Sequence, residues 1–157
     1  MSSTVDPSQT AATASPGNGR RTLSACCGVH ALHDGYTDLL NVLYPLLQAQ
    51  FGLSYAAVGA LKLLYSSAMA SGQVPSALLA ERLGGARMLA LGTALAALGY
   101  VVAGLSGGLM GVAIGLVLAG FGGATQHPIA SSLISSAFTG VRSRTALGTY
   151  NFSGDVG

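Results

Sequence analysis

The chain has 157 residues, half of them apolar and only 8% of them charged, whereas an ordinary soluble domain carries about 25% charged residues. So little charge cannot cover a water-soluble surface, and we expect an all-α integral membrane protein with several spans in a lipid bilayer. The net charge of +2 is too small to indicate nucleic acid binding, and the adjacent Cys26 and Cys27 cannot form a disulfide framework.

The chain divides into a polar tail and an apolar remainder. Residues 1–22 are rich in Ser, Thr, Ala, Pro and Gly without periodicity, so we expect a disordered cytoplasmic tail. Residues 23–157 are expected to form one transmembrane domain. Its predicted spans cover about 23–47, 55–79, 88–105, 109–137 and 146–157, and we expect the chain to break off inside the fifth span.

The first predicted span carries a polar face. At 100° per residue, seven polar side chains share roughly a 140° arc of one helix. A single acid at mid-membrane costs about 2.5–3.5 kcal/mol, so two acids predict a protein-lined or water-filled interior. Imidazole titrates near neutral pH, so this face is interpreted as a proton or substrate pathway, or alternatively as hydrogen bonds that tie the helix to its neighbours. Its members are His30, His33, Asp34, Thr37, Asp38, Asn41 and Tyr44.

The second predicted span contains a lysine, Lys62, within apolar sequence. Because the first two spans run antiparallel, Asp38 and Lys62 are expected at similar depth, and an ion pair between them is one interpretation. The other is that the long stem of Lys62 carries its charge to the outer membrane interface. The residues alone leave both interpretations open.

The third and fourth predicted spans differ in character. The third places Gly92, Ala96, Gly99 and Ala103 at spacings of three and four, which predicts a face for close helix packing. In the fourth, the proline at position 128 predicts a kink or a broken helix.

Gln126 and His127 beside that proline indicate a second polar site for ligands or ions, or else a kink in which His127 bonds a carbonyl. A metal ion held by His30, His33 and His127 is a further interpretation, since imidazoles three residues apart can share a metal. The chain adds no supporting cysteine or tight acid cluster, so we expect no metal site and no cofactor.

The arginines predict the orientation. If the spans alternate, the tail and the two predicted loops at 80–87 and 139–144 lie on one side of the membrane, and all the arginines fall there. By the positive-inside rule the N-terminus is then cytoplasmic. The arginines are Arg20, Arg21, Arg82, Arg87, Arg142 and Arg144.

The loop between the second and third spans carries a family resemblance. Residues 77–87 read Ala-Leu-Leu-Ala-Glu-Arg-Leu-Gly-Gly-Ala-Arg, and Glu81, Arg82, Gly84 and Arg87 resemble the corresponding loop in the N-terminal half of major facilitator superfamily transporters. Ala77 stands where that pattern has its first glycine, and Gly-Ala replaces its basic pair. The resemblance implies a helical bundle of twelve spans, with the C-terminal half missing here and the first and fourth helices lining a central cavity.

Other segments resemble the fosmidomycin-resistance-like branch of that superfamily. They are His33-Asp34-Gly-Tyr36, Gln73-Val-Pro75, His127-Pro128-Ile-Ala-Ser131 and residues 148–157. This resemblance implies a secondary transporter in the plasma or inner membrane that moves a small polar or drug-like solute by symport or antiport, drug efflux included. We expect proton coupling with Asp34 and Asp38 as carriers, and no enzymatic activity.

The remaining polar residues of the two faces are expected to contact the substrate or to tune the carriers: His30, His33, Asn41, Lys62, Gln126 and His127. Two alternatives stay open at this point. One is a complete four-span protein that transports as an oligomer, and the other is a membrane-embedded metal-dependent enzyme that uses the His/Asp residues.

Overall fold

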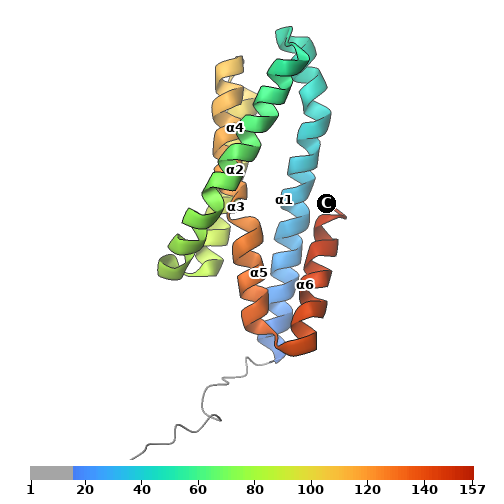
Figure 1. The fold of residues 1–157 in the computed structure, drawn as a ribbon, viewed down its shortest axis with the longest axis vertical. Helices are drawn as coiled ribbons and strands as arrows, with labels where there is room; N and C mark the ends of the chain where they lie inside the picture. Colours follow the sequence, from blue (N-terminus) through green and yellow to red (C-terminus); the bar gives the residue numbers. More distant parts are fainter. Residues whose placement is uncertain (1–15) are drawn as a thin grey trace, which may run out of the picture.

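The computed structural model describes residues 16–157, which form six helices and no strand within that range (Figure 1). The three longest helices come first along the chain, and the last three are shorter because the chain is interrupted after α4 and again after α5. Their bounds are α1 Pro16–Phe51, α2 Tyr55–Leu83, α3 Gly85–Leu105, α4 Leu109–Gly123, α5 Gln126–Ala137 and α6 Gly140–Gly154. The predicted all-α bundle is confirmed.

The helices run past the predicted ends of the spans. Residues 16–22, expected as part of a disordered tail, form the first turns of α1, while residues 1–15 lie outside the described residues. The predicted loop at 80–87 shrinks to Gly84, whose φ of 88° is readily adopted by glycine, and α6 begins inside the predicted loop at 139–144. Arginine and glutamate are good helix formers, so charged residues extended these helices beyond the apolar spans.

Two separate apolar cores hold the bundle together. One joins α1, α3, α5 and α6 around Cys26, Leu89, Ile134 and Tyr150. The other joins α1, α2 and α4 around Leu40, Tyr44, Leu61, Tyr65 and Leu116. His30, His33, Asp34 and Thr37 of α1 lie between these two cores along the helix.

The outer surface suits lipid. By length and apolar composition, two helical stretches of the described chain are able to cross a membrane, Gly85–Leu105 and Leu109–Ala137. Large apolar side chains are exposed on several helices, an arrangement that is unfavourable in water and favourable in a bilayer. They include Val42, Leu46, Leu63, Leu98, Val101 and Ile114.

The small-residue face predicted on the third span packs closely against α4. An added Cβ at Gly92 would meet the side chain of Thr125, and one at Gly99 would meet the backbone of Gly115 and Ala119. This packing confirms the predicted contact face and holds α4 against α3.

Enlarging Gly99 tests this contact. Gly99→Leu is expected to push α3 away from α4 and to lower the free energy of unfolding by about 1–3 kcal/mol, because backbone atoms cannot swing aside. Gly104→Leu is the matched control, since a Cβ there has no heavy atom within 4 Å. Thermal unfolding in detergent compares the two variants, and equal midpoints would contradict the packing described.

Candidate functional site

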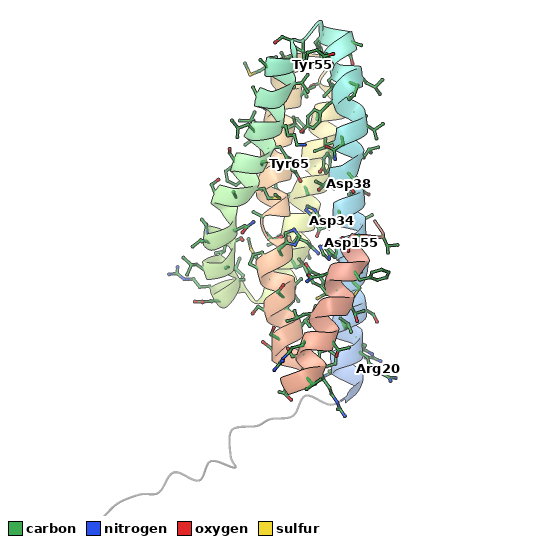
Figure 2. The ribbon with its side chains drawn as sticks, turned by 45° about the vertical axis from the view of Figure 1, so that its right-hand side comes forward. Arg20, Asp34, Asp38, Tyr55, Tyr65 and Asp155 are labelled. Carbon is green, nitrogen blue, oxygen red and sulfur yellow. The ribbon has the colours of Figure 1, made fainter. Side chains whose placement is uncertain are left out.

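The polar face of α1 divides by depth in the bundle. His30 and His33 are buried, with 3% and 6% of their surface exposed, while Asp34 is half-buried. Asp38 and Asn41, farther along the helix, are exposed. Figure 2 shows Asp34 and Asp38 in succession along α1, near Asp155 at the end of α6. The face is therefore anchored by imidazoles and presents carboxylates on its accessible side.

His30 is held by α6. Its Nδ1 lies 2.8 Å from the carbonyl oxygen of Tyr150, and its ring stacks on the Tyr150 ring with centroids 4.1 Å apart at 15°. A carbonyl oxygen only accepts, so Nδ1 carries the hydrogen and donates it. The other ring nitrogen, Nε2, lies 3.0 Å from Oδ2 of Asp34, at the distance of an ion pair but without the alignment of a hydrogen bond.

Glycine makes the close approach of α6 to this pair feasible. A Cβ atom at Gly154 would contact Oδ2 of Asp34 and lie 2.6 Å from Cε1 of His30. The backbone of α6 thus covers the pair directly, while 29% of the Asp34 side chain stays exposed. The pair is enclosed on one side and accessible on the other.

The helix break predicted near position 128 is confirmed. Helix α4 ends at Gly123 and α5 begins at Gln126, so that Pro128 falls in the first turn of α5, where its missing N–H is tolerated. Proline cannot bond the carbonyl four residues earlier, which belongs to Ala124. That carbonyl instead accepts a hydrogen bond from Oγ of Ser76 on α2, at 3.3 Å.

A residue of α6 also forms a hydrogen bond to the break. The Tyr150 hydroxyl donates to the carbonyl of Gln126 at 3.4 Å. Gln126 is 2% exposed, and its Nε2 has no hydrogen-bond partner. The first residue of α5 is therefore buried beside His30 through the same tyrosine that holds the imidazole.

His127 completes the cluster from α5. Its ring meets that of His30 edge-on at 5.2 Å and that of His33 at 6.5 Å. The ligand atoms of His30, Asp34 and His127 all lie within 4.8 Å of one another, and His33 is not in that set. Ligands of one zinc ion lie about 2.0–2.2 Å from it, so separations near that limit would have to close before all three could bind one ion.

A second polar contact lies one turn along α1. The Thr37 hydroxyl lies 3.1 Å from the hydroxyl of Tyr65 on α2, and it also bonds the His33 carbonyl. The His33 ring packs over Gly123 at the end of α4, where a Cβ would lie 2.7 Å from Cε1. His33 thus links α1 to the start of the break rather than to the His30–Asp34 pair.

The ion pair between Asp38 and Lys62, one of the two interpretations left open by the sequence, is not formed. Both side chains are exposed, and α2 diverges from α1 below the turn that joins them (Figure 1). Asn41 is likewise exposed and outside the buried cluster. The expected loop residues Glu81, Arg82, Gly84 and Arg87 are all exposed at the junction of α2 and α3.

Two site residues were missed by reasoning from the sequence, Tyr65 and Tyr150. Each is a buried tyrosine, 4% and 1% exposed, in a stretch where no spacing of polar residues distinguishes it from an apolar core position. The one signal for Tyr150 was its place in the segment at 148–157 that resembles the fosmidomycin-resistance-like branch.

Comparison with known proteins supplies the family. Residues 26–157 match the family model described as Major Facilitator Superfamily. No curated protein and no solved structure matches the chain. The matched range includes every residue of the polar cluster, from His30 on α1 to Gly154 on α6. The chain therefore belongs to the Major Facilitator Superfamily, a family of membrane-embedded secondary transporters.

Proposed function

We propose that this transporter couples solute movement to proton transfer, with Asp34 and Asp38 as the proton carriers. The contact between His30 and Asp34 is the observation that supports the proposal. Because Nδ1 donates to Tyr150, a neutral His30 would leave Nε2 without a hydrogen and 3.0 Å from a carboxylate oxygen. Two electron-rich atoms at that distance repel, whereas one added proton makes the contact attractive.

The energy at stake is large enough to drive a structural change. Opposite charges about 4 Å apart attract by about 4 kcal/mol at an effective dielectric of about 20. Gaining or losing the proton therefore changes the free energy of the contact between α1 and α6. The change is comparable with the free-energy difference between two conformations of a protein. Alternating access needs such a difference between the two states of the carrier.

The accessible side of the cluster is proposed as the substrate pathway. Asp38, Asn41 and His127 are exposed there, and polar side chains at membrane depth need a protein or water-filled partner. We propose that a second half of the transporter faces them, and that Lys62 and Gln126 belong to the same pathway. The solute is proposed to be small and polar or drug-like.

The positions of the arginines support a cytoplasmic N-terminus in the plasma or inner membrane. The tail end of α1, the junction of α2 and α3 and the start of α6 lie toward one end of the bundle, and the junctions after α1 and α3 lie toward the other (Figure 1). Every arginine belongs to the first group. We therefore propose that this end faces the cytoplasm.

Transport in liposomes tests the proposal. The full-length protein is reconstituted, a pH gradient is imposed, and a panel of small polar and drug-like solutes is tested for accumulation, with fosmidomycin included. Accumulation of at least one solute that collapses when a protonophore dissipates the gradient is the expected result. Solute movement that ignores the gradient would overturn proton coupling while leaving the family assignment intact.

A further inference from the structure

One buried residue, Tyr150, contacts both the His30–Asp34 pair and the break between α4 and α5. Tyr150 is 1% exposed and makes three contacts at once. Its carbonyl accepts from Nδ1 of His30, its ring stacks on the same imidazole, and its hydroxyl donates to the carbonyl of Gln126. The first two contacts hold the proton pair, and the third holds the first residue after the break between α4 and α5.

We propose that Tyr150 is a positioning residue that links the protonation of the His30–Asp34 pair to the break between α4 and α5. The inference rests on the proposed proton coupling. When the pair loses its proton, the neutral imidazole no longer attracts the carboxylate, and we expect the ring to turn away from Asp34. The ring cannot turn alone, because it is both stacked on Tyr150 and bonded to its carbonyl.

The weakest contact yields first. The bond from the Tyr150 hydroxyl to Gln126 is 3.4 Å long, against 2.8 Å for the bond to His30. A long hydrogen bond is weak, so movement of the tyrosine releases Gln126 before it releases the imidazole. The carbonyl of Ala124 keeps its own bond to Ser76 on α2, so the loosening is expected at the start of α5.

The surroundings of His30 make Asp34 the group that decides the effect. The titratable groups facing the imidazole are Asp34 and His33 on α1, His127 on α5 and Tyr150 on α6. Among these, Asp34 is the carboxylate, and its attraction for a protonated ring favours the arrangement in which the pair is in contact and Tyr150 bonds Gln126. This arrangement therefore binds the proton more tightly than one in which these contacts are broken. By linkage it loses stability as the pH rises.

Hydrogen exchange of the backbone amides measures this link without a known substrate. The full-length protein in nanodiscs is labelled between about pH 5 and 8, the range in which histidine changes charge. Exchange rates are corrected against a peptide from the tight contact between α3 and α4. We expect protection of residues 124–127 to fall by about fivefold as the pH rises, the factor expected for one ordinary hydrogen bond.

Two tyrosine variants separate the link from general packing. Tyr150→Phe keeps the ring and the carbonyl but removes the hydroxyl. The backbone amides at its break should therefore exchange as fast at low pH as the wild-type amides do at high pH. Tyr44→Phe is the matched control, because Tyr44 is also buried and its hydroxyl has no hydrogen-bond partner. The control should retain the wild-type pH dependence.

The outcomes divide cleanly. The link would be overturned if amide exchange at the break of Tyr150→Phe kept the wild-type pH dependence. It would also be overturned if exchange at the wild-type break did not depend on pH. Spectra in which Nε2 of His30 still exchanges its hydrogen in Tyr150→Phe would locate the loss in the link rather than in the pair. Failure of proton coupling itself would appear in the liposome assay, as solute movement independent of the gradient.

Discussion

Replacing Asp34 by asparagine is expected to abolish transport driven by a pH gradient and to leave the protein folded. Asparagine is nearly the same size and can still contact Nε2 of His30, but it cannot take up and release a proton. Loss of a positioned proton-transfer group slows the step by about a hundredfold or more. Gradient-driven accumulation of solute in liposomes should therefore fall to the level of liposomes without protein.

Asp155→Asn is the control for this experiment. Asp155 is exposed just beyond the end of α6, so its neutralisation should leave transport near the wild-type level. Asp38→Asn should slow transport without abolishing it, since Asp38 is exposed and no histidine contact holds its proton. Intact gradient-driven transport by Asp34→Asn would remove Asp34 from the mechanism.

Gly154→Val is expected to have the second largest effect, on both stability and transport. The new Cβ would occupy the space of the Asp34 carboxylate and the edge of the His30 ring. Overpacking of this kind costs about 1–3 kcal/mol, and the pair can avoid it only by giving up its contact. The variant should therefore unfold at a lower temperature and lose its dependence on the pH gradient.

Gly148→Val provides the comparison on the same helix. A Cβ at Gly148 has no heavy atom within 4 Å, so the helix tolerates a side chain there, and valine has a higher helix propensity than the glycine it replaces. Unfolding midpoints in detergent and gradient-driven transport are measured for both. Similar losses in the two variants would show that valine weakens α6 in general and that the contact with the pair is not special.

The sequence was sufficient wherever one helix determines the outcome. The spacing of Gly92 and Gly99 predicted a face for close helix packing, though not that α4 would cover it, and Pro128 predicted the break before α5, because both effects are steric and local. The polar face of α1 follows from helical periodicity alone. Its division into buried imidazoles and accessible carboxylates does not, since burial depends on which helices approach that face.

Contacts between polar side chains of different helices were not settled by the sequence. Similar depth left an Asp38–Lys62 ion pair open, yet α2 diverges from α1 and the pair is not formed, because helix crossing cannot be obtained from depth. Tyr150 was missed because its importance comes from a backbone carbonyl and from stacking on His30, neither of which leaves a pattern in the sequence. Gly154 likewise gains its meaning from the residues that it faces.

The protonation of His30 is the most direct test of the central claim, that the His30–Asp34 pair holds an exchangeable proton on the Nε2 side. The chain has three histidines, so nitrogen-15 NMR of labelled protein in nanodiscs, assigned with His33 and His127 variants, isolates His30. As the pH is varied, we expect Nδ1 to remain protonated, because it donates to the Tyr150 carbonyl, and the exchange of a hydrogen to take place at Nε2. A spectrum in which Nδ1 loses its hydrogen, or in which Nε2 stays unchanged throughout, would contradict the account.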